Sequence, residues 1–308
     1  MRLIQFLNLM KKSLFFLLAA ALGICSCKKA PASEPENVPV ETMRIPITLT
    51  TDISTKATDT GFEVNDKVGI YCVNYNGGTA GTLATSGNHV DNISFTYNGS
   101  LWNPATPVYW KDQTTKADFY CYYPYTASIS NVNNLAFSVK ADQSSIANYK
   151  ASELLWGKTE GAQPSEDPVK ITTRHAMSNV LVFVKPGKGY TDETLASEQI
   201  SVALLGLKTA AKINLANGKV TAEGNSTEMI PFKENGYWRA LVVPQDVVGA
   251  QLVKVTVGGS VYTLSQTVSF SSNKQHKCTI TVNKVSEGIN IGIGGWESDG
   301  TDFGGTVE

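Results

Sequence analysis

The sequence is 308 residues long and nearly balanced in charge, with 26 Lys and Arg residues against 27 Asp and Glu. Three of the basic residues and none of the acidic ones lie in residues 1–26, so the rest of the chain carries 23 basic against 27 acidic residues. This balance excludes a basic surface for nucleic acid or for anionic lipid. Only 17% of the residues are charged, while Gly, Thr, Ser, Asn, Val and Tyr are frequent, as is typical of β-strands and turns.

The first 26 residues have the layout of a secretory signal peptide. Two lysines precede an apolar run at residues 13–24, which is shorter than the roughly 20 apolar residues of a transmembrane helix. Small Ser26 and then Cys27 follow this run, an arrangement that resembles the lipobox of bacterial lipoproteins. We therefore predict a lipoprotein signal peptide over residues 1–26 and lipidation of Cys27.

Two alternatives stay open at this end of the chain. Cys25 is a second candidate acceptor of lipid, but bulky Ile24 would then occupy the cleavage position, which favours Cys27. Met10 is an alternative start, since the sequence MKKSLFFLL opens a cleaner signal. Either choice sends the folded chain out of the cytoplasm.

The pattern changes sharply after the signal peptide. Residues 27–44 are polar and rich in proline without periodicity, which predicts a lipidated flexible tether. From residue 45 onward the period becomes two, because Ile45, Ile47 and Leu49 alternate with other residues as in a half-buried strand. We predict a strand over residues 45–53 with these three side chains facing a core.

Further short apolar runs, separated by Asn-Gly, Gly-Gly and Pro turn signals, continue along the chain. Strands are expected at residues 68–73, 93–97, 108–110, 117–123, 135–139, 153–156, 180–184, 200–207, 213–215, 237–243, 252–257, 261–264 and 278–282. Only residues 142–152 and 191–199 look helical, and both segments are short. The pattern predicts an all-β fold.

The polar stretch GAQPSEDP at residues 161–168 is the best internal boundary, because it carries two prolines between two strand-like segments. It divides the strands into two sets of about seven, which suggests two β-sandwiches. We predict an N-terminal β-sandwich domain over residues 45–165. The C-terminal β-sandwich domain would cover residues 166–308 and end in a Gly-rich extension.

Motifs that carry chemistry are sparse. Cys72, Cys121 and Cys278 lack metal-ligand spacing and lie in strand-like runs, where a free cysteine is usually a small buried residue; one disulfide is the alternative. The three histidines are scattered, and no GxSxG, HExxH or phosphate-binding glycine loop occurs. The sequence thus predicts no catalytic, cofactor-binding or metal site, and a protein that is not an enzyme.

A run of aromatic residues between residues 102 and 125 has two interpretations. On an exposed surface, Trp102, Trp110 and Tyr122 could form a platform on which sugars stack. Within a strand, the odd-numbered residues from 119 to 123 would instead face one side and the even-numbered ones the other, packing against neighbouring strands. The packing interpretation is favoured, and the glycan-binding surface lipoprotein is kept as the alternative function.

Several local signatures together resemble the fimbrillin family. They are FEVNDKVGIY at 62–71, PVYW at 107–110, ADFYCYYPY at 117–125, LLWG at 154–157, HAMSNV at 175–180, VPQ at 243–245, HKCTI at 276–280 and GW at 295–296. Each is weak alone, but their order and spacing span nearly the whole chain after the signal peptide.

The resemblance implies two transthyretin-like β-sandwiches in tandem, of about seven strands each. It also implies a stalk, anchor or tip subunit of type V pili on Gram-negative anaerobes, carried to the outer membrane as a lipoprotein. In stalk subunits a trypsin-like protease cuts near the first strand, and an extended strand of the neighbouring subunit fills the groove that opens. The implied partners are other fimbrial subunits, the outer membrane through the lipid, and a host glycan or protein as adhesion ligand.

On this resemblance, the removable strand would be residues 45–53. Candidate cut sites are Arg44, ahead of the strand, and Lys56, after it. Only a cut near Lys56 would free the whole strand, while a cut at Arg44 would release the tether alone. The residues after Cys27 lack the acidic cluster expected of a surface-export signal, so a periplasm-facing lipoprotein is the alternative to the cell surface.

Overall fold

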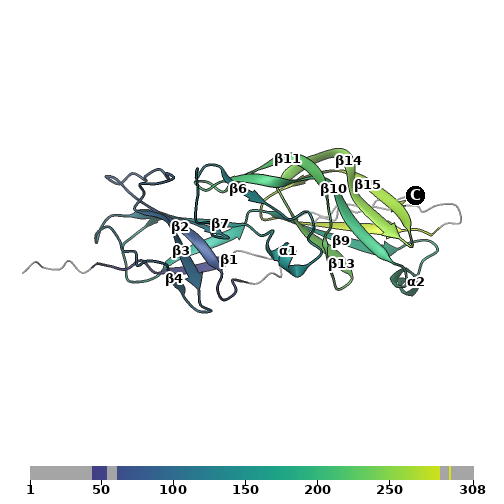
Figure 1. The fold of residues 1–308 in the computed structure, drawn as a ribbon, viewed down its shortest axis with the longest axis horizontal. Coiled ribbons are helices and arrows are strands. Elements are labelled where there is room, and N and C mark those ends of the chain that lie inside the picture. The colour runs from purple at the N-terminus through teal and green to yellow at the C-terminus, as the bar shows by residue number, and fades with distance from the viewer. Residues whose placement is uncertain (1–43, 54–60, 285–290, 293–308) are drawn as a thin grey trace, which may run out of the picture. The chain divides into compact units, whose positions relative to one another are not determined.

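The structure, a computed structural model, describes residues 44–53, 61–284 and 291–292 of the chain (Figure 1). Nearly all regular structure in these ranges is β-sheet, arranged in one seven-stranded sheet and two five-stranded sheets. The predicted all-β class is therefore confirmed. No helix of the described residues has the length and apolarity needed to span a membrane.

The seven-stranded sheet is built mainly from the first half of the chain. Its strands, in spatial order, are β1 (Leu49–Ile53), β8 (Val169–His175), β7 (Leu155–Ala162), β5 (Ala117–Tyr123), β2 (Lys67–Asn74), β3 (Val90–Tyr97) and β4 (Trp102–Pro104). All neighbours pair antiparallel except β1 and β8, which run parallel.

The central strands of this sheet are covered on both faces. Along β5, Phe119 and Cys121 belong to one buried cluster, whereas Tyr120 and Tyr122 belong to the other. Successive side chains of a strand point to opposite faces, so a strand buried on both faces reads as a continuous apolar run. The predicted split of odd-numbered and even-numbered residues in this strand is confirmed, and Tyr123 packs on the first cluster as well.

The other two sheets contain most of the second half of the chain. One has the order β11 (Lys219–Met229), β10 (Ile200–Asn214), β14 (Gln245–Val257) and β15 (Ser260–Phe270), with β6 (Leu135–Ser138) also paired to β10. The other has the order β12 (Phe232–Glu234), β13 (Tyr237–Val242), β9 (Ser178–Pro186), β16 (Gln275–Val282) and β17 (Ile291–Gly292).

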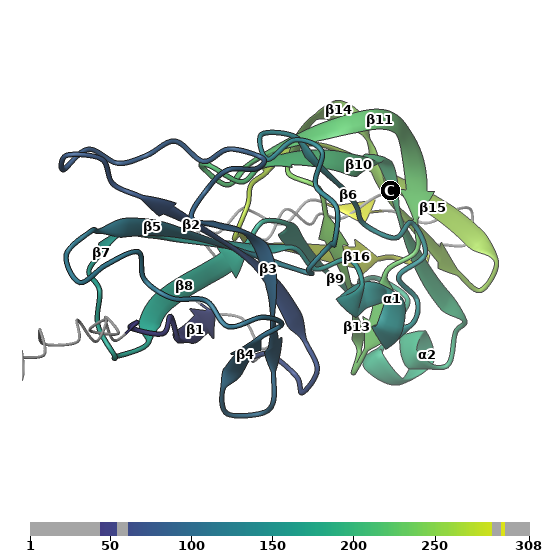
Figure 2. The same cartoon turned by 60° about the vertical axis from the view of Figure 1, so that its left-hand side comes forward.

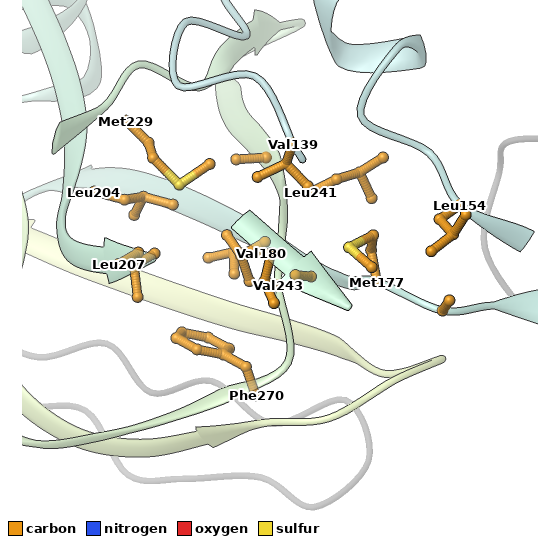
Figure 3. Packing of buried hydrophobic residues seen from close by; sticks show 14 of the residues in the cluster. Val139, Leu154, Met177, Val180, Leu204, Leu207, Met229, Leu241, Val243 and Phe270 are labelled. Atoms are coloured by element: carbon orange, nitrogen blue, oxygen red, sulfur yellow. The ribbon is translucent and has the colours of Figure 1, made fainter. Parts of the chain in front are cut away.

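The larger core cluster joins these two sheets. Figure 3 shows Leu204 and Leu207 of β10 facing Val180 of β9, with Phe270 of β15 alongside. These four side chains are at most 2% exposed. Apolar burial of this kind stabilises a fold by roughly 25 cal/mol per Å² of area removed from water, so this cluster is a main source of stability.

Both helices lie inside the segments predicted to be helical, and each begins at a side-chain cap. In α1 (Ile146–Lys150) the hydroxyl of Ser145 accepts the backbone N–H of Asn148. In α2 (Asp192–Ala196) the residues Thr191 and Thr194 form a capping box. Such caps satisfy N–H groups that have no partner within the helix.

Sheet pairing crosses the predicted boundary at residue 165 in both directions. The strands β7 and β8 pair antiparallel, so residues 163–168 connect two strands of one sheet. In the other direction, β6 leaves the first half of the chain to pair with β10. Apart from β6, the chain enters the other two sheets only after β8, and the division into two sandwich domains stays a prediction.

Candidate functional site

The predicted first strand lies at the edge of the seven-stranded sheet. Within the described residues β1 is the last strand in the order of the sheet, and it pairs in parallel with β8 from Leu49 and Val169 to Ile53 and Thr173 (Figure 2). An edge strand has only one hydrogen-bonded neighbour, so it is the strand that another chain can most easily replace.

The chain just before β1 is held by a second segment. Pro46 and Tyr109 form an antiparallel bridge. The backbone N–H of Ile47 donates to the carbonyl of Val108, and that of Trp110 donates to the carbonyl of Ile45, both at 2.9 Å. Residues 45–53 are therefore bonded along their length, first to residues 108–110 and then to β8.

The inward side chains of this segment fill the smaller core cluster. Ile47 and Leu49 are each 3% exposed, and half-buried Ile45 packs against the same cluster. The alternation predicted for these three residues is confirmed. They contact a core that also contains Val169 and Ile171 of β8, so the segment supplies both backbone hydrogen bonds and apolar side chains to this half of the molecule.

One side-chain hydrogen bond connects the two outermost strands of the sheet. The indole Nε1–H of Trp102 in β4 donates to the hydroxyl oxygen of Thr51 in β1 at 2.7 Å. Trp102 also packs edge-on against Phe62, with ring centroids 4.8 Å apart. The sheet is thus curled around the smaller cluster, and β1 closes it.

The residues predicted as a glycan platform are buried, which corrects that hypothesis. Trp102, Trp110 and Tyr122 are 6%, 5% and 1% exposed. Trp110 packs against Phe119 in the smaller cluster. The hydroxyl of Tyr122 donates to the amide oxygen of Asn92 at 2.7 Å and accepts the backbone N–H of Thr126 at 3.3 Å, so it is bonded within the protein. A sugar can stack only on an exposed ring face, and neighbouring strands and loops cover these faces.

The residues predicted for processing lie at the limits of the described chain. Arg44 is exposed, and its guanidinium lies 5.8 Å from the centroid of the Tyr109 ring. Lys56, the second candidate cut site, and Cys27, the candidate lipid acceptor, both lie outside the described residues. Those two assignments stay predictions.

Cys72, Cys121 and Cys278, the cysteines of the described residues, are all buried, as expected for structural residues. Burial raises the pKa of the Cys72 thiol to about 12, with the charge of Asp118 adding to the effect. Burial alone raises the pKa of Cys121 to about 12. A raised pKa keeps a thiol protonated and unreactive at neutral pH, which is the opposite of what a nucleophile requires.

The histidines are dispersed among unrelated contacts. His89 bonds to the carbonyl of Tyr109 at 2.7 Å, His175 contacts Glu153 at 2.8 Å, and His276 packs edge-on against Phe270. Among the described residues, no group of three His, Cys, Asp or Glu side chains has the arrangement of a metal site.

The residues that receive the first strand were not predicted from the sequence. These are the β8 residues Val169 and Ile171 and the 108–110 segment, which was predicted to be a strand without a partner. A signal was present in β8, where Val169, Ile171 and Thr173 are buried and the residues between them are exposed. Their pairing with β1 is a long-range contact that periodicity alone does not specify.

The structure is that of an all-β protein whose first described strand, β1, lies at the edge of its sheet while its Leu49 side chain is buried in the core. Solved structures with this fold include a crystal structure of a "putative cell adhesion protein" from Bacteroides uniformis, with a TM-score of 0.61 and 20% identity. A second "putative cell adhesion protein", from Bacteroides ovatus, has a TM-score of 0.64 and 16% identity. Each likeness covers 80% of this chain and 95% of the solved one.

Sequence comparison leads to the family. Residues 55–296 match the fimbrillin-like family, and the chain therefore belongs to that family. A relative from Bacteroides uniformis, "Putative fimbrium subunit Fim1C", is 24% identical over 304 residues, which cover 93% of this chain and 95% of the relative. The resemblance drawn from the sequence signatures is thus confirmed at the level of the family.

Proposed function

We propose that this protein is a structural subunit of a cell-surface fimbria, assembled when a strand of one subunit replaces residues 45–53 of the next. The observation that carries the proposal is the double role of this segment. It lies at the edge of its sheet, yet Ile47 and Leu49 fill the core. The fimbrium subunit among its relatives supports the same role.

Loss of the segment would leave two unsatisfied surfaces. The backbone groups of β8 and of residues 108–110 would lose their hydrogen-bond partners, and the smaller core would open where Ile47 and Leu49 had packed. A strand donated by a neighbouring subunit satisfies both at once. Because donation runs head to tail, the contact does not close on itself, and a filament follows.

Delivery and release are assigned to the N-terminal region. In this proposal the chain is exported as a lipoprotein and anchored in the outer membrane through Cys27. Multiple acyl chains anchor stably, since each buried CH₂ adds about 0.8 kcal/mol. A cut near Lys56 then frees residues 45–53, and a subunit that escapes cutting stays as an anchor. The role is structural and adhesive, without enzymatic activity or a cofactor.

The proposal is tested with two recombinant chains, one that begins at Lys28 and one that begins at Ala57. We expect the longer chain to stay monomeric and the shorter one to form SDS-resistant ladders or filaments. A synthetic peptide of residues 45–53 should suppress the ladders, and the same peptide with Leu49→Asp should not, because its charge would be buried in the core. A shorter chain that is folded and monomeric would rule out assembly by strand exchange.

A further inference from the structure

A pocket of about 600 Å³ lies where three turns of the second half of the chain meet strand β8. Asn217 comes from the β10–β11 turn, Lys219 from the start of β11, Asp246 from the start of β14, and residues 271–274 from the β15–β16 turn. The exposed side chain of Arg174 in β8 completes the lining. Arg174 follows Thr173, the register partner of Ile53, but none of the residues that line the pocket pairs with β1.

Positive charge dominates this pocket, although the chain after the signal peptide is net negative. Arg174, Lys219 and Lys274 line it, against the single carboxylate of Asp246. Neither Arg174 nor Lys219 forms an ion pair with a carboxylate of the described residues. Two exposed cations without a carboxylate partner can bind an anion by charge-assisted hydrogen bonds.

The guanidinium of Arg174 is held in place. It lies 4.9 Å from the centroid of the Trp156 ring, a cation–π contact across the neighbouring strand β7. The Trp156 indole is itself fixed, since its Nε1–H donates to the carbonyl of Leu215 at 2.8 Å. A stacked guanidinium still presents its N–H groups at its edge, so it is preorganised to donate to an oxyanion.

The neutral side chains of the pocket are left to donate hydrogen bonds. The amide oxygen of Asn217 accepts the backbone N–H of Lys219 at 2.9 Å, and that of Asn273 accepts the N–H of His175 at 3.3 Å. Each contact uses the amide oxygen and leaves the NH₂ group to donate to a ligand. The hydroxyls of Ser271 and Ser272 add two further groups of this kind.

The acceptors of the pocket, in contrast, are already occupied in part or in full. The carboxylate of Asp246 accepts the hydroxyl of Ser269 at 2.5 Å. The side chain of Gln245 is bonded at both ends, accepting from the N–H of Lys208 and donating to the carbonyls of Lys208 and Val243. A lining with an excess of donors suits a ligand that is rich in oxygen acceptors.

We propose that this pocket binds the acidic sugar of an anionic glycan, whose carboxylate or sulfate accepts from Arg174 and Lys219. The amides and hydroxyls around them would bond to ring hydroxyls. A saccharide is favoured over an acidic peptide because its ring hydroxyls can accept from the amide and hydroxyl donors that line the pocket beside the cations, while a peptide carboxylate uses the cations alone. The inference does not depend on strand exchange, so a monomeric chain suffices to test it.

The test uses calorimetric titration of the chain that begins at Lys28 with five probes. They are sialyllactose, a 6-sulfated N-acetyllactosamine, lactose, sodium sulfate and a pentaglutamate peptide. We expect at least one acidic saccharide to bind and lactose not to bind. Tighter binding of sialyllactose would identify a carboxylate as the preferred anionic group, and tighter binding of the sulfated saccharide would identify a sulfate. The proposal is overturned if neither acidic saccharide binds, or if sulfate or pentaglutamate binds as tightly as the better saccharide.

Substitutions then test whether Lys219 and Arg174 bind the saccharide. Lys219→Glu and Arg174→Gln should each weaken the better saccharide about tenfold or more, because each removes a charge-assisted hydrogen bond. Lys111→Glu is the matched control, since Lys111 is also exposed but lies outside the pocket and changes the net charge as Lys219→Glu does. Thermal unfolding checks that the variants are folded. Binding by Lys219→Glu equal to that of the control would contradict the assignment.

Discussion

The indole of Trp102 donates a 2.7 Å hydrogen bond to the hydroxyl of Thr51, although these residues lie on the two outermost strands of a seven-stranded sheet. The bond is possible because the sheet curls around the cluster that contains Ile47 and Leu49. Trp102 is 6% exposed, so water does not readily replace this partner. The bond is therefore a specific contribution of side chains to the retention of β1.

Replacing Thr51 with valine should loosen β1. The change keeps the shape of the side chain but leaves the buried indole N–H of Trp102 without its acceptor, which costs about 1–3 kcal/mol. Thr50→Val is the matched control, because Thr50 is exposed and lies one residue away on the opposite face of the strand. Urea unfolding measures the free energy of unfolding of each variant. Hydrogen exchange over residues 45–53 shows whether the loss of stability is in this segment. Equal stabilities of the two variants would contradict this role of the bond.

Gly218 lies against the ring of Trp156, which is far away in the sequence, and leaves no room for a side chain at position 218. It has φ +74°, and a Cβ at this position would come within 2.5 Å of Cε3 of Trp156. We expect Gly218→Ala to lower the free energy of unfolding by about 2–4 kcal/mol, from backbone strain and overpacking together. Gly224→Ala separates these effects, because Gly224 has φ +75° but only an ordinary 3.8 Å contact, and it should cost about 1 kcal/mol. A similar loss in both variants would show that the Trp156 contact is not limiting.

The buried thiols predict a loss of stability in alkaline solution. The pKa values of Cys72 and Cys121 are raised from 9.0 to about 12 in the folded protein, so the folded state keeps these two thiols neutral where the unfolded state ionises them. The contribution is present in full below pH 9 and is lost as pH rises toward about 12. Urea midpoints should therefore fall above pH 9, and less steeply for Cys121→Ala. Val68→Ala, which also opens a cavity in this core but removes no titrating group, should shift the midpoint equally at every pH. If the two variants share one pH profile, the thiols do not cause the loss.

Local pattern was sufficient to predict the class of fold and the first strand. The alternation of Ile45, Ile47 and Leu49 identified both the strand and its inward face. It was also sufficient for β5, where Phe119 and Tyr120 were placed on opposite faces. In these segments the side-chain period of two is uninterrupted, so the sequence carries the geometry directly.

Elsewhere the structure depends on contacts that no local pattern contains. Residues 200–207 and 213–215 were predicted as two strands, but β10 is continuous through register shifts next to Gly206, whose φ is +71°. The edge strand β11 is polar over most of its length and was missed. Periodicity showed that Tyr122 faces away from Phe119 but not that both faces are covered, which is why an exposed aromatic platform was considered.

Cleavage at the two candidate sites is expected to have opposite effects on assembly. Residues 45–47 are bonded to residues 108–110, and β1 is bonded to β8, so cleavage after Arg44 leaves the whole strand attached at its far end. While that covalent link persists, the strand competes with any donor at the high effective concentration of an intramolecular partner. In the proposed assembly, cleavage after Lys56 would remove this advantage, and a neighbouring strand would then displace residues 45–53.

We therefore expect limited trypsin treatment of the chain that begins at Lys28 to produce ladders, and Lys56→Gln to abolish them. Arg44→Gln should leave them unchanged, because that cut releases only the tether. Lys111→Gln controls for the loss of an exposed basic residue at a site outside the exchanged segment. Mass spectrometry identifies the bonds cut, and SDS electrophoresis without boiling reports assembly. Ladders that survive Lys56→Gln but vanish with Arg44→Gln would mean that exchange begins from the N-terminal end of the strand, since the pairing with residues 108–110 would then be what holds it in place.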